Sequence, residues 1–183
     1  RFRLIPTFGQ DTIRRFAKDV SELSKLGARD YEDILQCCLP VLQGLLPEPH
    51  NSVVLNMVFT LSHWHALAKL RMHTDSTLEE MDKTTTKLGE EVRKFDRVTC
   101  SQYETHKLDR EQAAQQRRKA CKQRTTHPTN LSTGPSRKKK KSFNYKTLKY
   151  HALGDYVPTI RRMGSILGYS TQMVSPIIMH SLL

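Results

Sequence analysis

Residues Asn51 to Met72 of this 183-residue chain read NSVVLNMVFTLSHWHALAKLRM and contain its most apolar stretch, Val53 to Met72. Its first half is apolar around most of the circumference of a helix, and polar residues gather towards its end. A helix that is apolar on every side is covered by other elements. Residues 51–72 therefore predict a central helix surrounded by others. Its polar residues make it too polar to span a bilayer, so no membrane partner is expected.

Apolar residues at helical spacing also occur before this stretch. One stripe predicts a helix from Asp11 to Leu26, ended by Gly27. A second helix is expected to begin near Asp30, because Asp is a favoured N-cap residue. Pro40 lies inside its pattern and should end or kink it.

The pattern continues after the central stretch, with a helix beginning within residues 73–77. Ser76 with Glu79, or Thr77 with Glu80, matches a capping box. The fold class predicted is all-α, an irregular bundle of about four to five helices. The expected organisation is a helical body over 1–124, a basic disordered linker over 125–142, an aromatic-rich helical segment over 143–172 and an aberrant or disordered tail over 173–183.

Positive charge is concentrated in one part of the chain. The chain has 30 Lys/Arg and 18 Asp/Glu, a formal net charge of +12. The basic segment, Lys107–Lys141, holds 12 Lys/Arg and 2 acids, a net of +10. It predicts a polyanion partner, above all nucleic acid, because Lys and Arg that neutralise phosphates release condensed counterions. The candidate nucleic-acid-binding residues are Arg117, Arg118, Lys119, Lys122, Arg124, Arg137, Lys138, Lys139, Lys140 and Lys141.

The run Arg137–Lys141 has three interpretations: a nuclear localisation signal, a non-specific nucleic-acid contact or a solubilising linker. Two smaller basic groups, around Arg71 and around Arg161 and Arg162, read as solvated faces. They gain interest only if the fold brings them to the same side as the basic segment.

The sequence gives no support for a metal or cofactor site. His63 and His65 are two residues apart and point to nearly opposite sides of a helix, and His73 lies about 12 Å further along the axis. No Cys or carboxylate stands beside them at ligand spacing, so core or hydrogen-bonded histidines around Trp64 are preferred. The role of His151 stays open. The four cysteines fit reduced thiols, and no nucleophile or phosphate-loop motif is present.

Several blocks resemble a known protein group. They are residues 6–16 (PTFGQDTIRRF), 45–51 (LLPEPHN), 63–75 (HWHALAKLRMHTD), 150–156 (YHALGDY), 159–162 (TIRR) and 169–172 (YSTQ). Together they resemble the C-terminal part of proteins encoded by Plavaka-type, CACTA-related DNA transposons of basidiomycete fungi. The resemblance covers about residues 1–172 and implies that residues 11–124 correspond to a helical insertion in a transposase nuclease.

The resemblance also implies that no catalytic residue carries over. The stretch before Tyr169 has no Asp, and residues 173–183 have no Glu and contain a Pro. The chain begins at Arg1, so we expect a fragment or a processed piece. The expected function is a non-enzymatic, transposon-derived nuclear fragment that binds DNA non-specifically through the basic segment. The alternative is a protein-interaction or self-association module in which that segment is a linker or a nuclear localisation signal.

Overall fold

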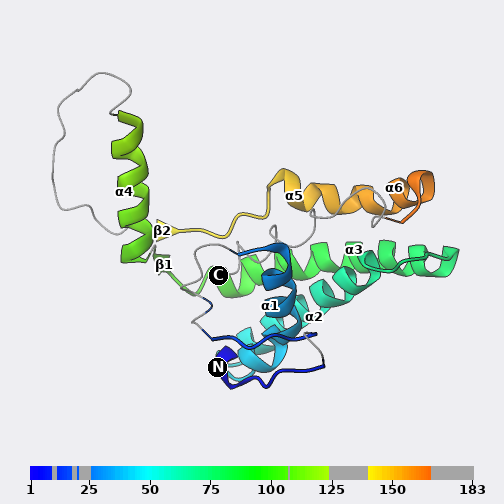
Figure 1. Cartoon of the computed structure of the whole chain (residues 1–183), viewed down its shortest axis with the longest axis horizontal. Coiled ribbons are helices and arrows are strands. Elements are labelled where there is room, and N and C mark those ends of the chain that lie inside the picture. Colours follow the sequence, from blue (N-terminus) through cyan, green and yellow to red (C-terminus); the bar gives the residue numbers. More distant parts are fainter. Residues whose placement is uncertain (10–11, 18–19, 21–25, 107, 124–139, 166–183) are drawn as a thin grey trace. The chain divides into compact units, whose positions relative to one another are not determined.

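The computed structural model describes residues 1–9, 12–17, 20, 26–106, 108–123 and 140–165, and it confirms the all-α expectation. Helices dominate, and the only sheet among these residues is a two-stranded ladder (Figure 1). In chain order, the elements are η1 (Phe2–Leu4), α1 (Ala28–Leu42), α2 (His50–Ala68), α3 (Asp75–Phe95), the π-helix η3 (Asp96–Cys100), β1 (Thr105–His106), α4 (Asp109–Gln123), β2 (Lys140–Lys141), α5 (Leu148–His151), η4 (Ala152–Asp155) and α6 (Tyr156–Met163).

The chain divides into two compact units. The body contains the described residues of Arg1–Thr99 and of Phe143–Leu183, and the smaller unit is Cys100–Ser142. The smaller unit thus begins at Cys100, ahead of the boundary expected after residue 124. The aromatic-rich segment belongs to the body, although the smaller unit separates the two in sequence.

The central helix of the body is α2, which packs against both α1 and α3. Trp64 is fully buried, and its indole N–H donates a 2.8 Å hydrogen bond to the hydroxyl of Thr85 on α3. Its ring also meets that of Tyr156 edge-on, with the centroids 4.8 Å apart. Trp64 therefore links α2, on which it lies, to α3 through its indole N–H and to α6 through its ring. This confirms the central position predicted for this helix.

Helix α3 begins with a cap at a different residue from those predicted. The Thr74 hydroxyl accepts a hydrogen bond from the backbone N–H of Thr77, and the Thr77 hydroxyl accepts one from the backbone N–H of Thr74. This reciprocal pair satisfies two N–H groups that the helix itself cannot. The predicted capping boxes, which started at Ser76 or Thr77, were therefore wrong. The N-cap residue is Thr74, and Thr77 takes the place of the Glu that usually completes such a box.

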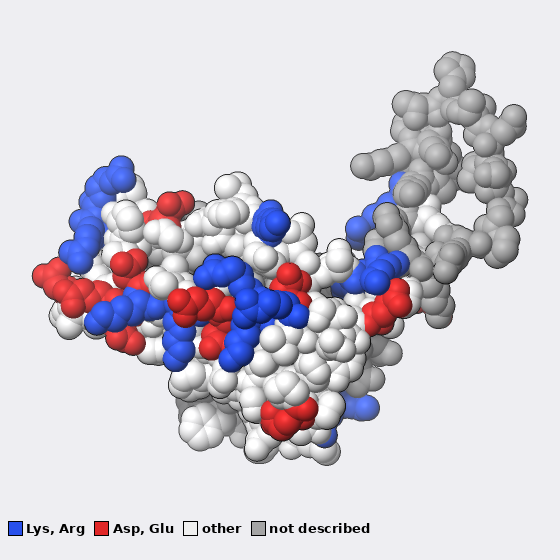
Figure 2. All heavy atoms as spheres, turned by 180° about the vertical axis from the view of Figure 1, so that it is seen from behind, with Lys and Arg blue, Asp and Glu red and all other residues white. Residues whose placement is uncertain are grey.

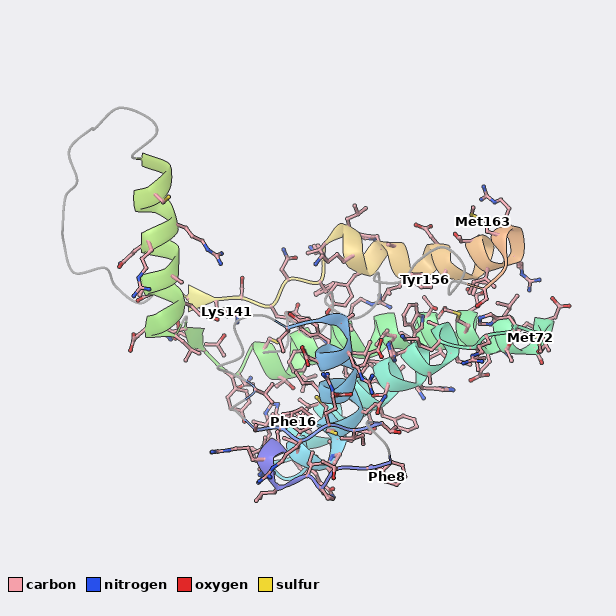
Figure 3. The ribbon with its side chains drawn as sticks, in the orientation of Figure 1. Phe8, Phe16, Met72, Lys141, Tyr156 and Met163 are labelled. Atoms are coloured by element: carbon pink, nitrogen blue, oxygen red, sulfur yellow. The ribbon has the colours of Figure 1, made fainter. Side chains whose placement is uncertain are left out.

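The segment 143–165 runs antiparallel to α3 and is attached along its length (Figure 3). The Phe143 ring meets Phe95, at the end of α3, with the centroids 5.2 Å apart. The Arg161 guanidinium lies 2.9 Å from the carboxylate of Asp75, at the start of α3. Beyond α6, Ser165 donates to the carbonyl of Leu70 at 3.1 Å. The helix ends before Gly164, whose φ of 81° favours glycine.

The helix predicted from Asp11 to Leu26 is not formed over residues 12–17, which the structure describes as non-helical. Phe8 and Ile13 pair as an isolated antiparallel bridge, and Phe16 packs on Phe2 with ring centroids 5.1 Å apart. Arg14 reaches α1, where it lies 2.9 Å from Asp33 and 2.7 Å from Asp30. Tertiary contacts thus override the local helical spacing.

The ionic contact of Arg14 explains where this segment is held. Asp33 is buried at 4% exposure, so its carboxylate needs a partner. The hydrogen bond with Asp33 is the main cause of the raised pKa of Arg14. Residues 125–139 of the linker predicted over 125–142, and the tail predicted over 173–183, lie outside the described residues. The end of that linker is described, and its residues Lys140 and Lys141 form β2.

Candidate nucleic-acid interface

The two ends of the basic segment are joined by backbone pairing. Strands β1 and β2 are antiparallel, with Thr105 opposite Lys141 and His106 opposite Lys140. The Thr105 hydroxyl also donates to the carbonyl of Lys141 at 2.8 Å. The basic segment therefore starts directly after β1 and ends with β2, which pairs with β1. Its two ends are held together, so it forms a closed loop.

Helix α4 occupies the first half of this loop. Its sequence is rich in Ala, Gln, Arg and Lys, which have high helix propensity, and it has almost no apolar stripe. Glu111 stabilises the start of the helix by accepting the backbone N–H of Leu108 at 3.3 Å. Acids at the first turn and cations towards the last complement the helix dipole. The same arrangement gathers cations at the C-terminal half of α4.

Two lysines at the end of the loop are paired with acids at its beginning. Lys140 Nζ lies 3.1 Å from Glu104 Oε1, and Lys141 Nζ lies 3.9 Å from Glu111 Oε1. All four side chains are at least one-third exposed. The hydrogen bond with Lys140 lowers the pKa of Glu104, which favours the charged form of this carboxylate. The paired lysines carry positive charge that is locally compensated.

The structure places the predicted site residues in three groups. Arg117 and Arg118 lie on α4 with exposed side chains. Lys140 and Lys141 make up β2, and each forms an ion pair. Lys119 and Lys122 also belong to α4, but their side chains lie outside the description. The remaining predicted residues, Arg124, Arg137, Lys138 and Lys139, lie outside the described residues.

Sequence reasoning did not identify Glu104 as part of this site. The pairing depends on the strand register, which sets Lys140 and Lys141 opposite His106 and Thr105. The available signal was indirect: three acids, Glu104, Asp109 and Glu111, precede or open the segment, and its lysines close it. Composition alone cannot align two strands that are more than 30 residues apart.

The body contrasts with the smaller unit in charge. Cys100–Ser142 contains 12 Lys/Arg and 3 Asp/Glu, a net of +9, so the other 140 residues carry +3 of the total +12. Figure 2 shows Lys and Arg interspersed with Asp and Glu over the described body on the face in view. Fields of opposite sign cancel on such a surface, and a one-sign segment attracts polyanions.

One end of the body carries a second group of exposed side chains. Met72 follows α2 and is 85% exposed, and Met163 at the end of α6 is 64% exposed. The Arg161–Asp75 ion pair and the Ser165–Leu70 hydrogen bond hold these two segments together (Figure 3). The structure thus joins the two smaller basic groups that were considered separately in the sequence.

The histidines of α2 and of the turn after it lie in different surroundings. No group of three or more His, Cys, Asp or Glu suited to a metal occurs in the described part of the chain. His63 is exposed beside Phe59, whereas His65 is buried next to Trp64. Burial lowers the pKa of His65 and of His73. His151 is exposed on α5.

Among the described helices, none is both long enough and apolar enough to cross a membrane. Comparisons with protein-family models, with curated proteins and with solved structures find no match to this chain.

Proposed function

We propose that this chain is a non-catalytic nucleic-acid-binding protein that contacts DNA phosphates without sequence preference through the basic segment. The carrying observation is the separation of charge: a unit of net charge +9 is attached to a body close to neutrality. Phosphate contacts supply affinity and no direct sequence information. The body is then the folded unit to which the basic unit is connected along the chain.

The geometry of the loop supports phosphate contact. Arg117 and Arg118 are exposed on a regular helix, where guanidinium groups are available for bidentate hydrogen bonds to phosphate oxygens. The pairing of β1 with β2 places Lys141 beside Glu111, on the first turn of the helix that carries Arg117 and Arg118. No base-reading element is required, and the proposal includes none.

The proposal extends to origin and location. The sequence blocks that resemble Plavaka-type transposon proteins support descent from the helical insertion of a transposase. The run Arg137–Lys141 supports nuclear targeting. We expect a fluorescent fusion of the chain to accumulate in nuclei, and the same fusion with glutamines at residues 137–141 to spread through the cell. Equal distribution of both would contradict the targeting role.

The binding proposal is tested by fluorescence anisotropy with a labelled DNA duplex and the full chain. The affinity should fall steeply between about 50 and 200 mM salt and should be similar for unrelated duplex sequences. A binding constant that does not change with salt, or a strong preference for one sequence, would refute the proposal.

The second candidate is self-association through the exposed end of the body. Met and Arg are enriched in protein interfaces, and both types are present there: Met72 and Met163 with Arg71 and Arg162. Light scattering would show a dimer that dissociates in the M72S/M163S variant. A monomer at all concentrations would remove this candidate and leave the nucleic-acid proposal unaffected.

A further inference from the structure

The two Glu–Lys ion pairs lie inside the segment proposed to bind DNA. Lys140 and Lys141 were candidate phosphate contacts in the sequence, yet each has a carboxylate within 4 Å. A carboxylate and a phosphate oxygen compete for the same ammonium group, since both are anionic hydrogen-bond acceptors. The lysines therefore have an internal ligand that occupies them before any nucleic acid arrives.

We propose that Glu104 and Glu111 are internal competitors of nucleic-acid phosphate, which hold Lys140 and Lys141 closed against β1 and α4 until a polyanion displaces them. The inference rests on the proposed function and assigns its regulation. It divides the basic segment into immediately available cations, exemplified by Arg117 and Arg118, and two lysines that become available only when their ion pairs open.

The structure shows why Lys140 and Lys141 pair with these two glutamates. The strand register fixes Lys140 and Lys141 at the same end of the loop as Glu104, through the Thr105–Lys141 pairing and hydrogen bond. Glu111 is held independently, because its second carboxylate oxygen accepts the backbone N–H of Leu108. The backbone N–H of Leu108 therefore preplaces the Glu111 carboxylate, which reduces the side-chain entropy lost when its pair forms, and Glu104 precedes the first residue of the paired strand β1.

The exposure of the pairs makes them displaceable. Exposed ion pairs contribute little because water and salt screen them, so a polyanion with many charges can replace them. From the range for such pairs, each carboxylate should weaken DNA binding by about 1.4- to 5-fold. Both together should weaken it by about 2- to 25-fold. Release of two lysines should also steepen the slope of log affinity against log salt by up to about 1.8.

The test is a cycle of variants of the full chain, measured by anisotropy with the same labelled duplex. Glutamine replaces the acids in E104Q/E111Q, the lysines in K140Q/K141Q, and all four in the combined variant. Glutamine keeps an oxygen that accepts the Leu108 N–H, and circular dichroism checks that each variant is folded. The control is E79Q/E80Q on α3, where two exposed acids are removed from the body with the same change in net charge.

We expect E104Q/E111Q to bind DNA more tightly than the wild type and with a steeper salt slope, beyond any change in the control. The lysine replacements should weaken binding more when the acids are already absent. Equal effects of the lysine replacements in both backgrounds, with salt-dependent binding by the wild type, would overturn the competition and leave the proposed function standing. Failure of every variant to bind DNA would overturn both.

Discussion

The contact between the N-terminal segment and α1 yields a quantitative prediction for the variant Arg14→Met. The Asp33 side chain is 6% exposed, and the Arg14 guanidinium is its cationic partner at 2.9 Å. Loss of one partner of a fully buried pair costs about 3–5 kcal/mol. Arg14 is itself 41% exposed, so water can reach part of the site. We therefore expect a loss of about 2 kcal/mol in the free energy of unfolding.

The measurement is urea unfolding followed by tryptophan fluorescence. Trp64 is the only tryptophan of the chain and is fully buried, so its emission reports on the core. The control is Arg15→Met, an adjacent exposed arginine, which should change stability by no more than about 0.5 kcal/mol. The double variant R14M/D33N should recover part of the loss, since it removes the buried charge. Equal stability of R14M and R15M would refute the reasoning.

Three further predictions follow from exposed or buried groups. The R117Q/R118Q variant should lower the salt slope of DNA binding by about 1.8, measured by anisotropy, and an unchanged slope would exclude these contacts. Burial lowers the pKa of His65 below its usual 6.5, so the unfolded state binds the proton more tightly. The free energy of unfolding should therefore fall as the pH decreases below about 6.5, and this fall should be less steep in the His65→Leu variant. Urea unfolding at several pH values measures both. Burial raises the pKa of Cys38 to about 12, so a thiol reagent should modify exposed Cys121 first, as mass spectrometry of the native chain would show.

The sequence predicted the parts of the fold that depend on local pattern. The central helix and the stop at Gly164 follow from apolar spacing and glycine conformation. A helix was also expected near Asp30, but it begins at Ala28, and its N-cap is Gly27, whose N–H donates to the Asp30 carboxylate, so Asp30 is not the N-cap. Pro40 lies in the last turn of α1, which ends two residues later at Leu42. These features need no information about distant residues.

The sequence failed where distant contacts decide. The spacing of Ile13 and Phe16 fits a helix, yet Ile13 pairs with Phe8 and Arg14 reaches α1, and residues 12–17 are not helical. The candidate site shows the same limit. Composition located the cations, but only the register of β1 and β2 reveals that Lys140 is already paired with Glu104.

The salt dependence of DNA binding tests the central claim most directly. If the ten Lys/Arg outside the two ion pairs each neutralised one phosphate, the slope of log affinity against log salt would be about −9, which is an upper limit on its steepness. The account predicts a linear decrease within this limit, and loss of binding when the basic segment carries glutamine in place of Lys and Arg while Trp64 fluorescence still shows a folded body. Undiminished binding by that variant would contradict the account.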